Sequence, residues 1–174
     1  MEFVPMLWST NKGHDGNKFL ADAKGAKVLL GLNEPERVDQ ASMDPALAAR
    51  AWKQYIEPLR AQGARLGSPA IAFSDEGLNW MQQFLNELDQ VGGRIDFLAP
   101  HWYGRVANNF INWITKARQR FGDSVTILDS LSWVERYAWF GAQLYLDAAL
   151  DSTNCLIASN GQLSELGQKY VYGF

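Results

Sequence analysis

Short apolar runs recur along the chain and are separated by segments in which apolar residues follow helical spacing. The runs contain many β-branched and aromatic residues, and Gly, Pro, Asn or Asp stand near their ends, which is typical of buried β-strands. This pattern predicts six strands, at residues 3–8, 28–32, 66–73, 95–99, 125–128 and 134–140.

Four helices are predicted between and after these strands. Asp44 is a suitable N-cap and Pro45 suits the first helical position, so a helix should run from there to about Ala61, before Gly63. Apolar residues at helical spacing place the other helices at about residues 78–88, 110–117 and 163–170. The alternation of strands and helices favours an α/β fold whose parallel strands are joined by right-handed crossovers.

One connection departs from this pattern. Parallel neighbours need a crossover of about a dozen residues or more, but only five residues separate Leu128 from Val134. Either the last two strands pair antiparallel, or a helix with its flanking segments is missing between them; we favour the missing segment. A complete eight-stranded barrel also usually needs about 200 residues or more, which exceeds the 174 residues of this sequence.

The strand at residues 28–32 leads directly into Asn33-Glu34-Pro35. Because the residue before a proline is disfavoured in a helix, Pro35 should hold Asn33 and Glu34 out of any helix at the carboxyl end of the strand. Barrels of alternating strands and helices place their active sites at that end. Glu34 is therefore the first candidate for a catalytic acid.

Composition and charge narrow the possible functions. The net charge of −3 gives no basic surface for nucleic acid or for an anionic membrane. A single cysteine, Cys155, excludes an internal disulfide, and two histidines, His14 and His101, argue against a zinc site, so we expect no metal and no cofactor. We find no signal peptide and no apolar run long enough to span a bilayer. With 47% hydrophobic residues, the sequence predicts one domain over residues 1–174.

The aromatic content is high, at 13% with seven tryptophans. Trp and Tyr rings stack on the C–H faces of sugars, and their polar tips can hydrogen-bond hydroxyl groups. Many of these rings should simply be core, so only those that gather at strand ends bear on function.

Seven stretches carry a resemblance that extends over nearly the whole chain. They are residues 3–8, 30–35, 55–59, 66–70, 97–104, 134–141 and 159–163. In this order they resemble the fungal glycosyl hydrolase catalytic core of glycoside hydrolase family 128 and the alkali-sensitive linkage proteins. The resemblance implies a (β/α)8 TIM-type barrel, in an extracellular or cell-wall setting, that cleaves β-1,3-glucan with retention by means of two glutamates. It aligns the first strand here with the family's third, so we expect an incomplete barrel that lacks the first two strands and a crossover near the seventh.

The resemblance gives the motif at the end of the second strand a catalytic role. Glu34 matches the general acid/base, which must be protonated in the ground state to donate to the leaving oxygen. Asn33 would hydrogen-bond the sugar hydroxyl beside the reacting carbon. The purely structural alternative is that Glu34 is a surface acid that precedes a helix.

Aromatic residues at other strand ends match the family's sugar-binding positions. His101, Trp102 and Tyr103 would line the subsite around the reacting sugar, one of them positioning the nucleophile and a ring stacking on glucose. Trp139 would form the floor of that subsite, and Trp8 is a weaker candidate for sugar contact. As a structural alternative, the His-Trp-Tyr run could be a packed strand exit.

The second catalytic carboxylate is where the sequence departs from the family. Members carry a Thr-Glu-Phe-like ending on the seventh strand, followed by a long helix. Residues 121–128 fit the approach to that strand, but the expected glutamate does not follow. An ungapped continuation places Asp129 at the nucleophile position; alternatively, residues 128–133 match the lead-in to the last strand, and the nucleophile and its helix are absent.

Two functions of different classes follow from these observations. The first is a retaining endo-β-1,3-glucanase acting on fungal cell-wall glucan, impaired by the loss of the nucleophile segment. The second is a non-catalytic β-glucan-binding or remnant protein. Both have β-1,3-glucan polysaccharide as the expected partner.

Overall fold

The computed structural model describes residues 3–103, 107–121 and 155–172. The chain divides into two compact units, Met1–Glu135 and Arg136–Phe174, and each is described by itself. The strands predicted at residues 125–128 and 134–140 lie outside the described residues. The expectation of one domain over residues 1–174 stays a prediction.

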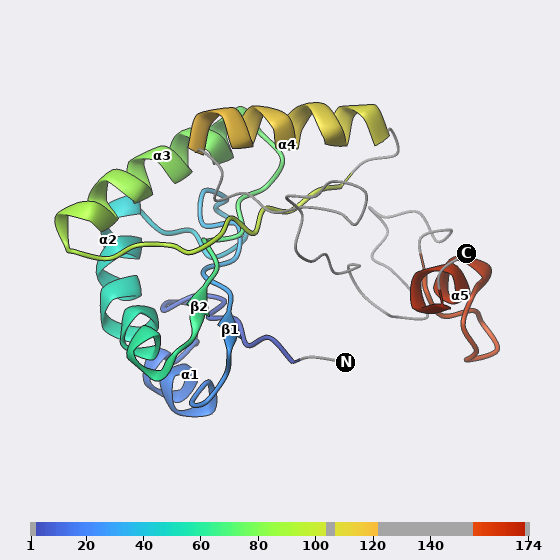
Figure 1. Cartoon of the computed structure of the whole chain (residues 1–174), viewed down its shortest axis with the longest axis horizontal. Helices are drawn as coiled ribbons and strands as arrows, with labels where there is room; N and C mark the ends of the chain where they lie inside the picture. The colour runs from blue at the N-terminus through green and yellow to red at the C-terminus, as the bar shows by residue number, and fades with distance from the viewer. Residues whose placement is uncertain (1–2, 104–106, 122–154, 173–174) are drawn as a thin grey trace. The chain divides into compact units, whose positions relative to one another are not determined.

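Four segments of the first unit lie side by side as parallel strands in the order of the sequence. Strand β1 (Val28–Leu29) pairs with strand β2 (Arg65–Leu66), as Figure 1 shows. Single parallel bridges add the segments on either side: Met6 pairs with Leu30, and Gly67 pairs with Phe97. The first four predicted strands are therefore confirmed as adjacent parallel segments, although the regular ladder is short.

Helices connect or follow these segments in the first unit. They are α1 (Gly16–Asp22), α2 (Pro45–Ala51), the π-helix η1 (Trp52–Ile56), the 3-10 helix η2 (Glu57–Gln62), α3 (Asp75–Gln90) and α4 (Ala107–Phe121). The predicted helices at 45–61, 78–88 and 110–117 are confirmed, whereas α1 was not predicted from the sequence. In the second unit, α5 (Glu165–Tyr172) confirms the last predicted helix, after an antiparallel bridge between Ile157 and Leu163.

The helical segment from Pro45 to Gln62 changes type along its length. Asp44 caps its start by accepting hydrogen bonds from the N–H groups of Ala46 and Leu47. Pro58 lacks an N–H donor and its ring crowds the preceding turn, which accounts for the change from α to π and 3-10 geometry. Gly63 ends the segment with a φ of +85°, a value that only glycine adopts readily.

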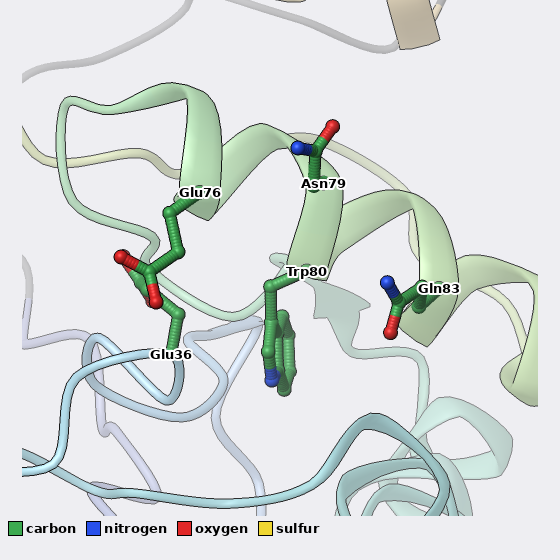
Figure 2. A pocket seen from close by; sticks show the side chains of 5 residues that line it. All are labelled: Glu36, Glu76, Asn79, Trp80 and Gln83. Carbon is green, nitrogen blue, oxygen red and sulfur yellow. The ribbon is translucent and has the colours of Figure 1, made fainter.

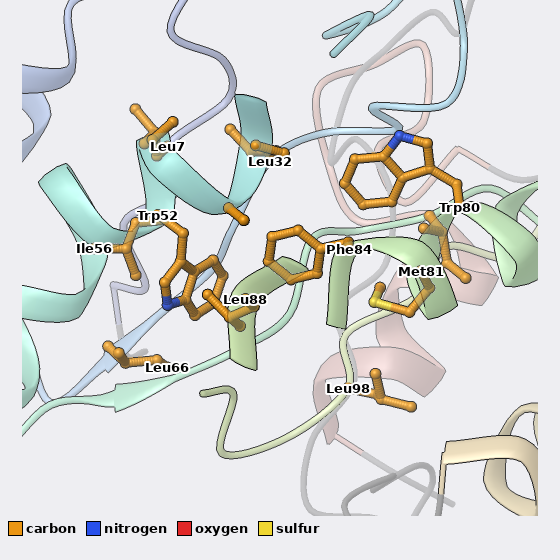
Figure 3. Packing of buried hydrophobic residues seen from close by; sticks show 14 of the residues in the cluster. Leu7, Leu32, Trp52, Ile56, Leu66, Trp80, Met81, Phe84, Leu88 and Leu98 are labelled. Atoms are coloured by element: carbon orange, nitrogen blue, oxygen red, sulfur yellow. The ribbon is translucent and has the colours of Figure 1, made fainter. Parts of the chain in front are cut away.

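The core of the first unit lies between the parallel strands and the helices α2, η1 and α3 (Figure 3). Trp52 and Phe84 are fully buried and meet edge to face, with ring centroids 5.6 Å apart. Trp80 stacks on Phe84, with ring centroids 5.4 Å apart. Leu29 and Leu66, from the paired strands, are also fully buried.

An ion-pair network holds the amino ends of two strands against η2. Arg60 donates to Asp96 Oδ1 and Glu57 Oε1, each at 2.6 Å. Asp96 Oδ2 in turn accepts from the N–H of Leu66 at 2.7 Å. Burial alone would raise the pKa of Glu57, but the hydrogen bonds from Arg60 and Trp52 outweigh it and hold that pKa below its ordinary value. The amino ends of the strands are thus occupied by a structural network, and the candidate chemistry lies at the opposite ends.

Candidate functional site

Backbone hydrogen bonds bring the ends of the parallel segments to one edge. The N–H of Asn33 donates to the carbonyl of Trp8 at 3.0 Å, and the N–H of Glu34 donates to the carbonyl of Ala70 at 2.7 Å. The N–H of His101 donates to the carbonyl of Ile71 at 2.9 Å. These bonds place the Trp8, Asn33, Glu34 and His101 positions at the carboxyl ends of neighbouring strands, as the sequence predicted.

Glu34 is a buried carboxylate with basic neighbours. Its residue is only 7% exposed, and its Oε1 lies 2.9 Å from Nδ1 of His101. Its Oε2 lies 3.4 Å from Nε of Arg37, a side chain that is about half exposed. Glu34 adopts a φ of +40°, which is uncommon for a residue with a side chain. The structural alternative of an exposed acid is therefore wrong, because the carboxylate is enclosed and hydrogen-bonded.

Tyr103 lies on the same side as His101 and Glu34. The rings of His101 and Tyr103 meet edge to face, with centroids 6.2 Å apart. Burial raises the pKa of the Tyr103 hydroxyl, and the negative charge of Glu34 adds to the effect. The hydroxyl therefore stays protonated at neutral pH and is able to donate a hydrogen bond.

Trp102 faces a different set of partners from its two neighbours. Its ring packs against Phe73, with centroids 4.1 Å apart, and against Phe110 of α4, with centroids 5.3 Å apart. Alternate residues of an extended segment point to opposite sides, so Trp102 joins this aromatic packing while His101 and Tyr103 approach Glu34. Its predicted role in stacking on sugar stays a prediction.

The remaining predicted residues have different placements. Asn33 donates from its side-chain amide to Gln40 Oε1 at 2.9 Å. The ring of Trp8 stacks on that of His14, with centroids 4.7 Å apart. Asp129 and Trp139 lie outside the described residues.

Two residues of the site were not predicted. Arg37 and Gln40 belong to the loop that follows Pro35, and their contacts with the motif depend on how that loop folds back. The N–H of Ala41 donates to the carbonyl of Asn33 at 3.1 Å, which closes the loop over the strand end. No spacing rule in the sequence signals this closure.

A cavity of about 400 Å³ lies beside the same loop (Figure 2). It is lined by Glu36, Glu76, Asn79, Trp80 and Gln83. Glu36 Oε1 accepts from the N–H of Ala72 at 2.6 Å, and Glu36 Oε2 is buried without a hydrogen-bond partner among the described residues. Burial raises the pKa of Glu36 above its ordinary value of 4.5, and the charges of Glu34 and Glu76 raise it further.

This raised pKa predicts how stability should respond to Glu36→Gln. A carboxyl group whose pKa is raised in the folded state stabilises most when protonated, below about pH 4.5, and that contribution is lost as pH rises through the folded pKa. Glutamine stays neutral throughout. We therefore expect the stability of the variant relative to the wild type to increase between pH 4 and pH 8, measured by urea unfolding. An unchanged difference over this range would contradict the expected burial cost of the ionised group.

Among the described residues, no group of three His, Cys, Asp or Glu side chains could hold a metal ion. The helices of the described part are also all too short or too polar to cross a membrane. The site therefore consists of a buried carboxylate with a histidine, an arginine and a tyrosine around it, at the carboxyl edge of parallel strands.

Parallel strands joined by helices, with an enclosed acid at their carboxyl ends, define a (β/α)-type protein. The chain belongs to the glycosyl hydrolase catalytic core family, whose model matches residues 1–127 and 120–170. The resemblance inferred from the sequence is thereby confirmed.

Individual relatives agree with this assignment. The chain is 34% identical to alkali-sensitive linkage protein 1 of Schizosaccharomyces pombe over 192 residues, covering 91% of this chain and 36% of that protein. It thus spans about a third of the length of this curated relative.

Solved structures of family 128 glucanases have the same fold. An exo-β-1,3-glucanase from Aureobasidium namibiae matches with a TM-score of 0.84 at 24% identity, over 98% of this chain and 77% of that one. An endo-β-1,3-glucanase from Amycolatopsis mediterranei, in complex with laminaritriose, matches with a TM-score of 0.75 at 26% identity, over 97% of this chain and 81% of that one.

Proposed function

We propose that this protein binds β-1,3-glucan at the Glu34 edge of its parallel strands and that hydrolysis of the bound glucan is impaired. The observation that carries the proposal is the Glu34 carboxylate, 7% exposed and 2.9 Å from His101, at the strand ends of a family that includes β-1,3-glucanases. Tyr103 beside it supplies both a ring face and a hydroxyl group for a sugar.

In this proposal Glu34 is the general acid/base. A protonated Glu34 would donate to the glycosidic oxygen as the bond breaks, and the resulting carboxylate would later accept a proton from water. His101 would orient the Glu34 carboxyl group through the contact at Nδ1. Asn33, held by Gln40, would hydrogen-bond the neighbouring sugar hydroxyl. Stacking of Trp139 and Trp102 on the sugar stays a prediction of the family resemblance.

We propose that hydrolysis is impaired at the step that needs the second carboxylate, the nucleophile. The alignment with the curated relative is 192 residues long, longer than this whole 174-residue chain. The family model matches in two stretches that both include residues 120–127. The longer alignment supports an internal segment missing from this chain. The two overlapping matches support a position near the seventh strand, where the family carries its nucleophile. Asp129 remains the substitute, and an incomplete barrel that also lacks the first two strands remains a prediction.

The second candidate function is glucan binding without any turnover. The same missing segment favours it, because a binding protein needs the aromatic and polar surface but not the second carboxylate. For either function we propose an extracellular or cell-wall location, where β-1,3-glucan of the fungal wall would be met. Family 128 includes both exo- and endo-β-1,3-glucanases.

A binding assay on insoluble β-1,3-glucan tests this proposal. We expect the purified chain to sediment with curdlan, and Tyr103→Ala to weaken binding about tenfold, because about 1.4 kcal/mol of ring contact is lost. The matched control is Tyr172→Ala, a change at a tyrosine that is 78% exposed on α5 and should leave binding unaltered. Absence of sedimentation, or equal weakening by both changes, would contradict the proposal.

A further inference from the structure

The segment that presents Glu34 adopts a backbone conformation that its surroundings must hold. Glu34 has a φ of +40°, which is unfavourable for a residue with a Cβ atom. The N–H of Glu34 donates to the carbonyl of Ala70, and the N–H of Arg37 closes a turn onto the carbonyl of Glu34 at 3.0 Å. Strained backbone of this kind persists only where several contacts determine it.

Glu36 supplies a further contact from the same segment. Its Oε1 accepts from the N–H of Ala72 at 2.6 Å, two residues beyond the carbonyl that receives the N–H of Glu34. The carboxyl group lies against the first turn of α3, where Gly77 leaves room for it. A Cβ atom at Gly77 would lie 3.1 Å from Glu36 Oε1 and 2.6 Å from the carbonyl oxygen of Ala72.

We propose that Glu36 is a positioning residue that ties the Glu34 segment to the strand end at Ala72 and so holds Glu34 Oε1 against His101 Nδ1. The inference rests on the proposed function, because it explains how the candidate acid is oriented. Only Oε1 makes the tie, since Oε2 has no partner among the described residues. The length of the Glu36 side chain should therefore determine how Glu34 is positioned, and the charge of Glu36 should not.

The two histidines of the chain allow a direct measurement. A carboxylate oxygen can only accept a hydrogen bond, so a neutral His101 that bonds the Glu34 carboxylate through Nδ1 carries its proton on Nδ1. Nitrogen-15 imidazole spectra distinguish this tautomer from the Nε2–H form, which predominates in a histidine without such a bond. His14 serves as the internal reference, and Glu34→Ala gives the spectrum of His101 without the oxygen that it contacts.

Two substitutions at Glu36 separate the effect of side-chain length from the effect of charge. Glu36→Gln keeps an oxygen within reach of Ala72, and we expect His101 to remain mainly in the Nδ1–H form. Glu36→Asp keeps the charge but is shorter by one methylene, and we expect His101 to shift to the Nε2–H form, as in Glu34→Ala. Glu76→Asp, the same change at the other glutamate of the cavity, should leave His101 unaltered.

The tautomer of His101 in the two Glu36 variants decides whether the inference holds. Loss of the Nδ1–H form in Glu36→Gln, or its retention in a folded Glu36→Asp, would overturn the inference even if both variants melt earlier. Should Glu36→Asp fail to fold, Glu36→Ala makes the same test, because it removes the oxygen that accepts from the N–H of Ala72 together with the unpartnered Oε2. A parallel titration with laminaritriose tests the proposed function separately. If the variants show the expected tautomers but the wild type does not bind the sugar, the proposed function is refuted and the positioning role is not.

Discussion

Laminarin should be hydrolysed by the purified chain at least about a hundredfold more slowly than by a family member with both catalytic glutamates. Retention requires two carboxyl groups about 5 Å apart, one to protonate the leaving group and one to form the glycosyl-enzyme bond. Asp129, the candidate for the second role, is one methylene shorter than glutamate, and a misplacement of about 1 Å can cost on the order of a hundredfold in rate. A reducing-sugar assay on laminarin measures this deficit.

Variants at the two carboxylates identify the source of any residual rate. We expect any residual rate to fall in Glu34→Gln, which removes the acid/base, and in Asp129→Asn, which removes the substitute nucleophile. Turnover at the family's ordinary rate that disappears in both Glu34→Gln and Asp129→Asn would contradict the proposed impairment and would identify Asp129 as the nucleophile.

Trp52→Ala should reduce the free energy of unfolding of the first unit by about 4 kcal/mol. The Trp52 side chain is fully buried against Phe84, and truncating a large aromatic residue in a core costs about 3–5 kcal/mol. The change also removes the indole N–H that donates to Glu57 Oε2 at 3.1 Å. Since a small domain has about 5–15 kcal/mol in total, this loss is a large fraction of its stability.

Urea unfolding followed by tryptophan fluorescence measures the effect of Trp52→Ala. Phe3→Ala is the control, because this aromatic side chain is 84% exposed and its removal should change stability by less than about 0.5 kcal/mol. A loss below about 1 kcal/mol in Trp52→Ala would mean that the contact between η1 and α3 is not part of the stable core.

Much of the described fold could be predicted because its strands are short apolar runs with clear ends. The capping pair Asp44-Pro45 and the stop at Gly63 defined one helical segment to within a residue. The helix α1 escaped prediction because it has only seven residues, too few to establish a helical period. The change to π and 3-10 geometry within 45–62 could have been suspected from Pro58 alone.

The residues of the candidate site that follow parallel strands could be predicted from the sequence. Glu34 and His101 are 67 positions apart in sequence, and they meet because both follow parallel strands whose carboxyl ends share an edge. Strand alternation could also have separated Trp102 from its two neighbours. The contacts of Arg37 and Gln40 could not be predicted, since they arise from a loop closed by long-range backbone hydrogen bonds.

Proton NMR of laminaripentaose mixed with the chain tests the central claim most directly, because one sample reports binding and hydrolysis together. The account predicts that the sugar signals broaden on addition of the wild type, and broaden much less with Tyr103→Ala. It also predicts that new reducing-end signals are absent, or grow at least about a hundredfold more slowly than with a family enzyme that has both glutamates. Sugar signals that stay sharp would contradict glucan binding, and rapid growth of reducing-end signals that requires Glu34 would contradict the impaired hydrolysis.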